Sequence, residues 1–435
     1  MRVAARDRKV KSEYKRTEVG VIPEDWEVDN LKRFWAVIDC KHLTAKFVEN
    51  GIPLASIREV QSRFVELENA KQTTQLYYLA LIEGGRKPQP GDLIFSRNAT
   101  VGEIAQVAEW HPPFAMGQDV CLLRKKHSGF SSEYLQAVIR SPMVLKQLVN
   151  FMVGSTFKRV NVEQIRNLIV PMPFPEEQTA VATVLSDIDS LIVSLDRLIA
   201  KKRDIKQATM QQLLTGKTRL PGFRNELKPI YKQTEVGMIP EDWEVKKLGD
   251  VAKIYRGASP RPIEDPKWFN EYSNVGWVRI SDVTKSVKFL FNTSQNLSEQ
   301  GVKQSHFVKQ ENLIMSICAT VGKPIITKID VCIHDGFVIF TNPKVNIEYL
   351  YYYLVSIENN WSKNGQTGSQ MNLNTTIIGN ENISCPTNLE EQRAIAAVLS
   401  DMDAEIAALE QKRDKTRVLK QGMMQELLTG KTRLL

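Results

Sequence analysis

The string Thr215-Gly-Lys-Thr218, which returns as Thr429-Gly-Lys-Thr432, has residue types that bind a nucleotide phosphate. In a phosphate-binding loop, glycines let backbone N–H groups approach the phosphate and a lysine adds positive charge. The fit here is poor, because Gln211 stands where the first glycine of such a loop would be. Each string also ends a predicted helix, whereas a phosphate loop opens one. We therefore expect no phosphate site at either string.

Trp110-His-Pro-Pro-Phe114 is the string closest to a methyl-transfer motif. It resembles the Asn/Asp-Pro-Pro-Phe/Tyr motif of amino-methyltransferases, in which an amide or a carboxylate orients the target amine. His111 stands at that position here, and no glycine-rich cofactor loop after a strand accompanies it. A proline turn that links two strands explains the string better. We therefore expect no methyl-transfer chemistry from it.

The histidines and cysteines show no spacing typical of a metal site. Asp39-Cys-Lys41 has the acid-x-Lys spacing of some nucleases, but chance produces this spacing in almost any basic chain. The cysteines are odd in number and widely spaced, which argues against a disulfide framework and fits a reducing cytoplasm. We expect no catalytic residue and no metal ion. The residues concerned are Cys40, Cys121, Cys318, Cys332 and Cys385, with His42, His111, His127, His306 and His334.

The composition is that of a folded and mildly basic protein. With 435 residues, 42% of them hydrophobic, the chain can form real cores and suggests roughly three domains. The 58 lysines and arginines exceed the 50 aspartates and glutamates, so the net charge of +8 suits a polyanionic partner without requiring one. Residues 1–16 are charged, and no run approaches the ~18 apolar residues of a membrane span. We expect a cytoplasmic protein with no membrane partner.

The chain contains a long direct repeat. Residues 14–28 return as 231–245, an offset of 217, and residues 176–220 return as 390–434, an offset of 214. The repeat is too long for a solenoid unit and indicates one duplicated module that folds into two similar halves. Between these constant frames the sequences differ strongly. Two constant frames with two divergent inserts predict a protein that recognises two different ligands or sites at a fixed separation.

Each half ends in a predicted long helix. The first runs from Glu177 to Leu214 without proline or glycine and, at ~1.5 Å per residue, would be roughly 55 Å long. Its apolar residues alternate in steps of three and four, the pattern of a coiled-coil seam, and the copy keeps the pattern except for Arg413 in place of Ile199. We expect the two helices to pack antiparallel. The predicted seam consists of Leu185, Ile188, Ile192, Leu195 and Ile199 with Leu399, Met402, Ile406 and Leu409.

The two inserts are faintly alike. Leu93-Ile-x-Ser-x-x-Ala-Thr-Val-Gly102 matches Leu313-Ile-x-Ser-x-x-Ala-Thr-Val-Gly322, which predicts a strand, a polar turn and a second strand. Later helices are expected to begin at the caps Ser132 and Asn346. We predict an α+β fold with two similar recognition domains, separated by a pair of long antiparallel helices with pseudo-two-fold symmetry. The expected division is 1–175, a first domain with its N-terminal frame; 176–220, a long helix; 221–389, a linker and second domain; and 390–435, a long helix that pairs with the first.

The layout resembles the DNA-specificity subunit of type I restriction-modification systems. Ile22-Pro-x-x-Trp26 and Ile239-Pro-x-x-Trp243 open the two halves, a variable domain follows, and each half closes on a long helix ending Leu-Leu-Thr-Gly-Lys. The second half departs slightly, because Ile383-Ser-Cys-Pro386 lacks one of the prolines of the first. The resemblance covers essentially the whole chain after about Tyr14.

This resemblance implies a non-catalytic subunit that reads an asymmetric, two-part site in double-stranded DNA. One domain would read each part, and the helix pair would set the spacer between them. Two methyltransferase subunits would bind it and methylate adenine, and a restriction/translocase subunit would join them to cleave DNA. S-adenosylmethionine, ATP and magnesium would belong to those partners, with no cofactor in this chain. We expect the methyltransferases to dock on the helices and the adjoining frames.

Base reading in the major groove requires arginine, lysine and amide side chains on exposed loops. In the first half the candidates are Arg97, Asn98, Lys158, Arg159 and Asn161; in the second they are Arg279, Gln366, Gln370, Asn372 and Asn374. A solvated loop residue is the alternative for each. Trp26 and Trp243 are partner contacts or packing residues, and packing is the favoured interpretation because they repeat with their frame.

Two other classes of protein stay open. A self-sufficient methyltransferase or nuclease with a fused recognition module would need a cofactor or metal motif, and none is found in the sequence. A coiled-coil scaffold that joins two protein ligands and ignores DNA is compatible with the mild charge. Salt-dependent, sequence-selective binding to DNA would argue against the scaffold.

Overall fold

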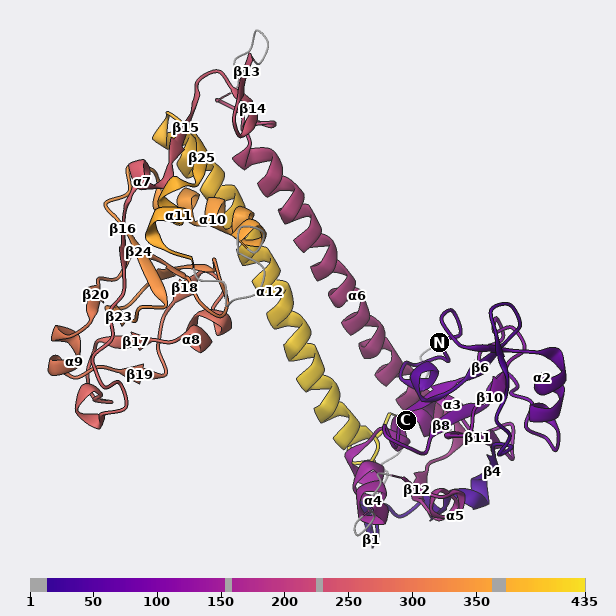
Figure 1. Ribbon diagram of the computed structural model, residues 1–435. Coiled ribbons are helices and arrows are strands. Elements are labelled where there is room, and N and C mark those ends of the chain that lie inside the picture. Colours follow the sequence, from indigo (N-terminus) through magenta and orange to yellow (C-terminus); the bar gives the residue numbers. More distant parts are fainter. Residues whose placement is uncertain (1–13, 153–158, 224–229, 362–372, 435) are drawn as a thin grey trace, which may run out of the picture. The chain divides into compact units, whose positions relative to one another are not determined.

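The computed structural model describes residues 14–152, 159–223, 230–361 and 373–434. The chain forms two compact units, each considered by itself below. Unit 1 comprises residues 1–196 and 411–435, and unit 2 comprises residues 197–410. The boundaries fall inside the two long helices, so each unit contains one insert domain (31–168 in unit 1, 248–381 in unit 2) and a segment of both helices (Figure 1).

The main sheet of unit 1 has the strand order β4-β11-β8-β9 and is antiparallel throughout. A second sheet has the order β10-β6-β7-β5. The frame consists of a hairpin, β1-β2, and the pair β12-β3, which brings the two ends of the insert domain together. The elements are β1 (Tyr14–Thr17), β2 (Gly20–Pro23), β3 (Glu27–Asn30), α1 (Leu31–Phe34), β4 (Trp35–Asp39), β5 (Phe47–Val48), β6 (Ile52–Ala55), η1 (Ile57–Val60), β7 (Gln72–Thr73), α2 (Gln75–Ile82), β8 (Leu93–Ser96), β9 (Ile104–Gln106), β10 (Ala115–Met116), β11 (Val120–Lys125), α3 (Ser132–Ile139), α4 (Pro142–Met152), α5 (Val162–Arg166) and β12 (Ile169–Met172).

Unit 2 repeats this plan with one strand added. Its main sheet has the order β16-β24-β21-β22-β18, a second sheet has the order β19-β17-β23-β20, and the frame is formed by β13-β14 and β15-β25. The elements are β13 (Tyr231–Thr234), β14 (Gly237–Pro240), β15 (Trp243–Lys247), α7 (Leu248–Val251), β16 (Lys253–Arg256), η2 (Pro266–Trp268), β17 (Gly276–Val278), α8 (Ile280–Lys285), β18 (Phe289–Leu290), β19 (Gln295–Asn296), α9 (Glu299–Lys303), β20 (His306–Val308), β21 (Leu313–Ser316), β22 (Pro324–Thr327), β23 (Val331–Ile333), β24 (Phe337–Thr341), α10 (Ile347–Trp361), α11 (Thr375–Asn380) and β25 (Asn382–Pro386).

The long helices α6 (Pro175–Leu214) and α12 (Leu389–Leu427) pair antiparallel within each unit (Figure 1). In unit 1, Asp189 pairs with Lys420 at 2.6 Å and Asp196 with Arg417 at 3.0 Å. Residue numbers therefore increase along α6 while those of the partners decrease along α12, as in an antiparallel pair. In unit 2, the same relation links Lys206 to Asp403 at 2.5 Å and Lys202 to Glu405 at 2.6 Å. These helices, with the α+β insert domains, confirm the predicted fold class.

The predicted seam faces the inside of these pairs. Arg413, which replaces an apolar residue in the second helix, is half-buried and pairs with Asp196 at 3.4 Å in unit 1. The helices also seal the insert domains, because Val181 and Leu185 pack into the core of unit 1 and Met210 and Leu214 into that of unit 2. Of the seam residues, Leu185, Leu195, Ile199, Leu399 and Ile406 are buried, and Ile188, Ile192, Met402 and Leu409 are half-buried.

The repeated Thr-Gly-Lys-Thr strings end the helices, as predicted. Gly216 and Gly430 follow the last turns with φ of 68° and 66°, the left-handed conformation that glycine adopts without strain. A Cβ on Gly430 would lie 2.4 Å from Pro23 Cγ and 3.0 Å from Trp26 Cζ2. Trp26 and Trp243 are 1% and 0% exposed, so the interpretation of both tryptophans as packing residues is confirmed.

One stretch of α6 is long and apolar enough to cross a membrane by length and composition, which corrects the prediction that no such stretch exists. Only 28% of the stretch is buried inside the protein. Its buried face is occupied by Val181, Ala182 and Leu185 in the core of unit 1, and Asp189 of the same helix pairs with Lys420. Core packing and helix pairing therefore account for the buried part of this segment.

Candidate nucleic-acid interface

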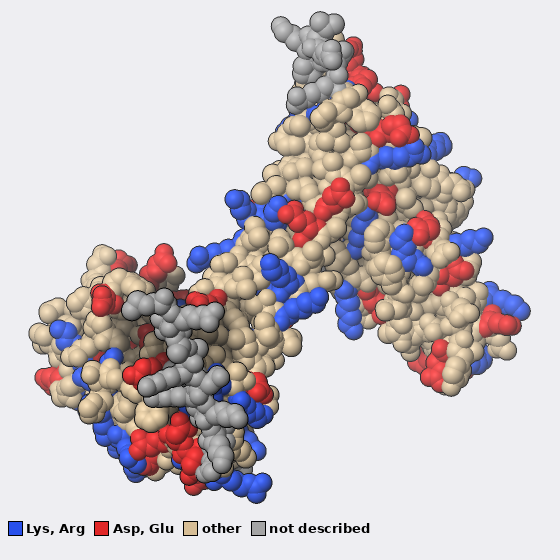
Figure 2. Space-filling model, turned by 180° about the vertical axis from the view of Figure 1, so that it is seen from behind, with Lys and Arg blue, Asp and Glu red and all other residues tan. Residues whose placement is uncertain are grey.

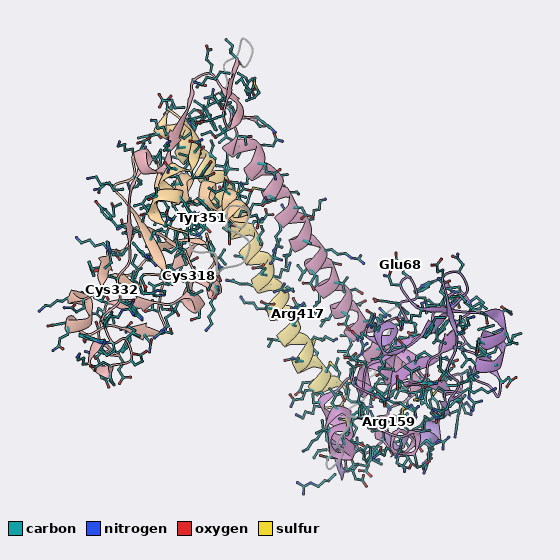
Figure 3. All side chains as sticks on the ribbon, viewed as in Figure 1. Glu68, Arg159, Cys318, Cys332, Tyr351 and Arg417 are labelled. Atoms are coloured by element: carbon teal, nitrogen blue, oxygen red, sulfur yellow. The ribbon has the colours of Figure 1, made fainter. Side chains whose placement is uncertain are left out.

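In unit 1 the structure brings together the two segments that supply the candidate base-reading residues. Asn98, in the turn after β8, and Arg159 form an isolated antiparallel bridge. The N–H of Val160 donates to the carbonyl oxygen of Arg97 at 3.0 Å, which ties the turn to the second segment. Arg159 is exposed and is labelled in Figure 3. The described residues therefore form one composite surface where the sequence suggested two separate loops.

The turn after β8 has an unusual backbone that unit 2 repeats. Ala99 and its equivalent Ala319 have φ of 54° and 56°, a left-handed conformation that costs a non-glycine residue about 1–2 kcal/mol. Ser96 stabilises the first turn by donating from Oγ to the carbonyl oxygen of Asn98 at 3.1 Å, and Ser316 donates to the carbonyl oxygen of Thr320 in the second. The backbone of the turn is thus constant, whereas Arg97-Asn98 in unit 1 is Ile317-Cys318 in unit 2.

Arg97 lies inside the domain rather than on a loop surface. It is 2% exposed, and its Nη2 lies 3.1 Å from Asp39 Oδ1 and donates to the carbonyl oxygen of Gln118 at 3.0 Å. The same nitrogen is 3.4 Å from Cys40 Sγ. A guanidinium with these partners orients its neighbours, and direct base contact by Arg97 would require this network to open.

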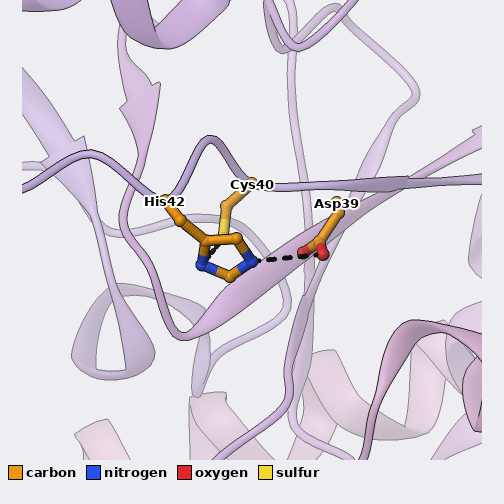
Figure 4. Close-up of side chains that lie close together, drawn as sticks. All are labelled: Asp39, Cys40 and His42. Carbon is orange, nitrogen blue, oxygen red and sulfur yellow. Dashed lines mark hydrogen bonds and ion pairs between the residues drawn. The ribbon is translucent and has the colours of Figure 1, made fainter.

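Asp39, Cys40 and His42 form the group of side chains with metal-ligand chemistry that is evident in the described part of the chain (Figure 4). Their donor atoms lie within 4.8 Å of one another, and His42 Nε2 is 3.4 Å from Asp39 Oδ2. Burial raises the pKa of the Cys40 thiol to about 11, and the thiol donates to the carbonyl oxygen of Gln118 at 3.1 Å. Arg97 already brings a positive charge to this group. A metal ion would have to displace that guanidinium, so these residues fit an arginine better than a metal.

Asn98 is half-buried in the turn, and its two amide atoms differ in their contacts. Its Nδ2 donates to Asp119, whereas its Oδ1 is buried and has no hydrogen-bond partner among the described residues. A buried amide oxygen without a hydrogen-bond donor costs free energy, and a hydrogen bond from a donor removes that cost. The oxygen is not exposed, so a ligand that covers the turn would reach it only after the Asn98 side chain rotates outward.

Asn161 and Asn374 are helix caps. The carboxamide oxygen of Asn161 accepts from the N–H of Gln164 at 2.8 Å, and that of Asn374 accepts from the N–H of Ile377 at 2.9 Å. Both residues are exposed. The same residue type serves helix capping and base reading, so the sequence pattern could not separate the two roles. The remaining candidates Lys158, Gln366, Gln370 and Asn372 lie outside the described residues.

The registers of the two main sheets agree with an equivalence that continues the repeat offset of 217, since 39 + 217 = 256. Ser96 pairs with Val120 as Ser316 pairs with Phe337. One residue further along, Cys121 pairs with Asp39, and Val338 pairs with Arg256. Asp39 and Arg256 therefore occupy the same position, at the end of the first strand of the sheet. The unit 1 surface therefore has an acidic residue at this position, and the unit 2 surface has a basic residue.

Two further arginines, Arg261 and Arg279, lie near Asp335 or His334, which follow the strand β23 in unit 2. Arg256 Nε donates to the carbonyl oxygen of Asp335 at 2.6 Å, and Arg261 Nη2 lies 3.8 Å from Asp335 Oδ2 with 78% of its side chain exposed. Arg279 is exposed, and its Nε donates to Gln295 Oε1 at 2.6 Å. Burial lowers the pKa of His334, and Arg279 lowers it further while Asp335 opposes the change. The surface therefore offers arginine side chains beside a neutral imidazole.

Arg279 was a candidate from the sequence, and the structure adds Arg256 and Arg261 as candidates. A usable signal was present, because Arg261 lies between prolines in the turn-rich segment Ser259-Pro-Arg-Pro262 directly after a strand. Cys318, labelled in Figure 3, lies in the neighbouring turn, and its Sγ is 3.7 Å from the carbonyl oxygen of Gly336. Elsewhere basic and acidic side chains are interspersed over the face that Figure 2 shows. The candidate interface is therefore defined by the residues at these strand ends.

A known protein family matches most of this chain. The model of the type I restriction modification DNA specificity domain matches residues 23–203 and 240–417. Over 446 residues the chain is 29% identical to a Methanocaldococcus jannaschii protein named as the MjaX specificity subunit of a type I restriction enzyme, with 97% of each chain covered. The MjaVIII specificity subunit of the same organism is 26% identical over 438 residues, which cover 95% of this chain and 94% of the relative.

A solved chain has the same fold. It comes from a study of complex assembly and conformational transition of the type I R-M system and matches with a TM-score of 0.59 at 19% identity, covering 94% of this chain and 99% of that one. The two matches to the domain model span well over half of the sequence, and the chain belongs to the type I restriction-modification DNA specificity family. It is a specificity subunit with two target-recognition domains, which confirms the resemblance found in the sequence.

Proposed function

We propose that this chain is a non-catalytic subunit that reads an asymmetric, two-part DNA site, with one insert domain on each part and the helix pair setting the spacer. In this proposal the Asn98–Arg159 surface belongs to the first half-site and the Arg256, Arg261 and Arg279 surface to the second. The chain would act in the cytoplasm, and the four-part division 1–175, 176–220, 221–389 and 390–435 would describe its working parts.

The observation that carries the proposal is the divergence of equivalent positions on a constant scaffold. Asp39 and Arg256 share one register position but have opposite charge, and Arg97-Asn98 is replaced by Ile317-Cys318 on the same strained turn. A duplicated packing element would keep its residues, whereas two readers of different base sequences need different donors and acceptors. The unequal surfaces therefore support an asymmetric site.

The chemistry of methylation and cleavage is assigned to partners. We propose double-stranded DNA, two methyltransferase subunits and restriction/translocase subunits as the partners, with S-adenosylmethionine, ATP and magnesium bound by those subunits. The Trp110-His-Pro-Pro-Phe114 string supports this assignment, because His111 Nδ1 accepts from its own backbone, the N–H of Ala108, at 3.0 Å. That contact makes a local turn and leaves no amide or carboxylate to orient a target amine.

Methylome sequencing of a host that carries this chain with its methyltransferase tests the proposal. The expected result is one asymmetric motif with two specified parts, a fixed unspecified spacer and modified adenine in each part. Salt-dependent binding of the purified complex to that motif, in preference to a scrambled one, would exclude a DNA-independent scaffold. Unmodified DNA despite an active methyltransferase would overturn the proposed function. Methyl transfer by the isolated chain would overturn the assignment of chemistry to partners.

A further inference from the structure

A basic residue followed by phenylalanine occupies the same place in the two insert domains, although the surrounding sequences differ. Leu93 pairs with Gln106 as Leu313 pairs with Ile326. Gln106 in turn bridges Phe64 in parallel, and Ile326 pairs in parallel with Phe289. Phe64 and Phe289 are therefore equivalent, and so are the residues before them, Arg63 and Lys288. Strand register identifies this pair, which no sequence motif marked.

In unit 2, Lys288 joins the insert domain to the long helix α12. Its Nζ lies 2.8 Å from Glu348 Oε2 and donates to Ser400 Oγ at 2.6 Å, and the Lys288 side chain is only 7% exposed. Tyr352 completes the junction, because its hydroxyl lies 3.3 Å from Lys288 Nζ and donates to Asp403 Oδ2 at 2.7 Å. The ammonium thus binds α10 of the insert domain and α12 of the helix pair at the same time.

Unit 1 has an equivalent but less complete junction. Arg63 Nη1 donates to Ser186 Oγ of α6, which corresponds to Ser400 in the repeat. Glu133 corresponds to Glu348, and Ala137 stands where unit 2 has Tyr352. A cavity of about 40 Å³ lies here, lined by polar groups that include Arg63, Glu133, Ser186 and Asp189. Its size suits roughly two water molecules in the space that a tyrosine fills in unit 2.

We infer that Arg63 and Lys288 are positioning residues, each of which fixes the angle of its insert domain on its own helix pair, and that the unit 2 junction is the tighter one. The inference rests on the proposed function, because an angle matters only if each domain reads a half-site. A cation bound to both the domain and the helix resists rotation between them. A rigidly held domain can meet its half-site at only one rotational setting.

The test separates spacer reading from base reading. The full chain, assembled with its methyltransferase subunits, binds duplexes that carry the site read from the methylome, with the natural spacer or one changed by a single base pair. Such a change rotates one half-site against the other by roughly 35°. A second set of duplexes keeps the spacer and changes one specified base of the second half-site. The spacer ratio is the affinity for the natural duplex divided by the affinity for the duplex with the changed spacer, and it reports positioning. The base ratio is the affinity for the natural duplex divided by the affinity for the duplex with the changed base, and it reports base recognition.

Lys288→Met keeps the length of the side chain and removes the charge. We expect the wild-type complex to lose at least about tenfold in affinity when the spacer changes, and the Lys288→Met complex to lose less than about threefold, with the base ratio unchanged. Arg63→Met should reduce spacer discrimination less than Lys288→Met does. Lys288→Arg should restore it. Lys328→Met is the matched control, because Lys328 lies over the same Phe289 ring, 4.5 Å from its centroid, but pairs with Glu311 within the insert domain.

Loss of folding alone would lower affinity for every duplex and leave both ratios as in the wild type. Folded Lys288→Met and Arg63→Met complexes that keep the wild-type spacer ratio overturn the inference while the proposed function stands. If Lys288→Met does not fold, Ser400→Ala, which removes one acceptor of the ammonium, is measured in its place, and an unchanged spacer ratio has the same meaning. A wild-type complex that binds no two-part site contradicts the proposed function itself.

Discussion

Arg433 forms a bidentate ion pair with Glu177, which lies in the first turn of α6. Its Nε lies 2.5 Å from Glu177 Oε1 and its Nη2 2.7 Å from Glu177 Oε2. The Glu177 side chain is fully buried and also accepts from Trp26 Nε1 at 3.0 Å. Unit 2 repeats the arrangement, with Arg219 on Glu391 at 2.8 and 2.5 Å. The arginine after each Thr-Gly-Lys-Thr string therefore closes a frame, and this explains why the string is repeated.

Arg433→Ala should destabilise unit 1 strongly. The substitution leaves the Glu177 carboxylate buried with only the indole N–H of Trp26, and breaking a buried ion pair from one side costs about 3–5 kcal/mol. We expect a lower midpoint of urea unfolding, followed by circular dichroism. Arg393→Ala removes an exposed partner of Glu390 and should cost less than about 1 kcal/mol. Equal midpoints for the two variants would contradict the role of Arg433.

Substitution of two glycines of unit 1 by alanine should change the stability of the unit in opposite directions. Gly430→Ala places a Cβ 2.4 Å from Pro23 Cγ in a left-handed conformation, so a loss of about 2 kcal/mol or more is expected. A Cβ added to Gly422, inside α12, would meet no described atom within 4 Å, and Gly422→Ala should stabilise by about 0.5–1 kcal/mol. Thermal unfolding of the two variants decides this, and a shift in the same direction for both would refute it.

Asn98→Ala and Arg279→Ala should each affect one half-site only. Asn98→Ala removes the unpartnered Oδ1 beneath the first surface and the hydrogen bond to Asp119, and Arg279→Ala removes a guanidinium of the second surface. A lost bidentate base contact by Arg279 would cost about 1–3 kcal/mol. Asn98 should cost less, because its Nδ2 is bound to Asp119 and only one acceptor remains. We expect each variant to lose discrimination between matched and scrambled sequences at its own half-site in a mobility-shift titration.

The control for this pair is Lys267→Ala. Lys267 lies in the same insert domain as Arg279 but pairs with Asp265 at 2.8 Å and covers the Trp268 ring. It should change affinity little and leave both discriminations intact. A uniform loss at both half-sites for Asn98→Ala or Arg279→Ala would indicate a phosphate contact or damage to the fold instead of base reading.

Glu348 should make unit 2 sensitive to acid. Burial raises its pKa, but the hydrogen bond and charge of Lys288 and the hydrogen bond of Ser400 outweigh this and leave the pKa below the ordinary 4.5. The stabilisation is therefore complete above about pH 4.5. It is lost as the pH falls through the lower folded-state value. Glu348→Gln should unfold more easily at pH 7, and its difference from the wild type should shrink towards pH 3 in urea titrations.

Glu358, in the same helix α10, should affect stability in the opposite direction, because its ionised form is disfavoured in the fold. Burial raises its pKa, and Lys323 opposes the shift only in part. Its ionised form is therefore disfavoured in the fold, and protonation restores stability as the pH falls. Glu358→Gln should stabilise unit 2 at pH 7 and lose that advantage in acid. The same direction of change for Glu348→Gln and Glu358→Gln would contradict the contacts described for both.

The fold was predictable where it rests on local pattern. Near-identical frames required two similar modules, and the three-four spacing of apolar residues placed the helix seam. Asn346 caps α10 as predicted, with its Oδ1 accepting from Tyr349 at 2.9 Å. The cap of α3 was predicted one residue late, because Ser131, not Ser132, accepts from Tyr134 at 3.1 Å. Two adjacent serines have equal capping propensity, so only backbone geometry separates them.

The site was less predictable because it depends on contacts between distant residues. Arg97 is buried because Asp39, far earlier in the sequence, and Gln118 receive its guanidinium. The repeat offset of 217 aligns Asp39 with Arg256, but only the strand register shows that both end the first strand of the main sheet. Arg63 and Lys288 match only in charge and in the phenylalanine that follows. Sequence spacing cannot report such relations, since a register is a property of paired strands.

The left-handed alanines, Ala99 and Ala319, bear on how such a protein evolves. The strained backbone has survived duplication while the two residues before each alanine were exchanged completely. The exchange came with a change of charge at the neighbouring strand end, where Asp39 receives Arg97 in unit 1 and Arg256 stands in unit 2. A lineage could therefore acquire a new preference by changing a few linked codons, while the host keeps the rest of the gene unchanged.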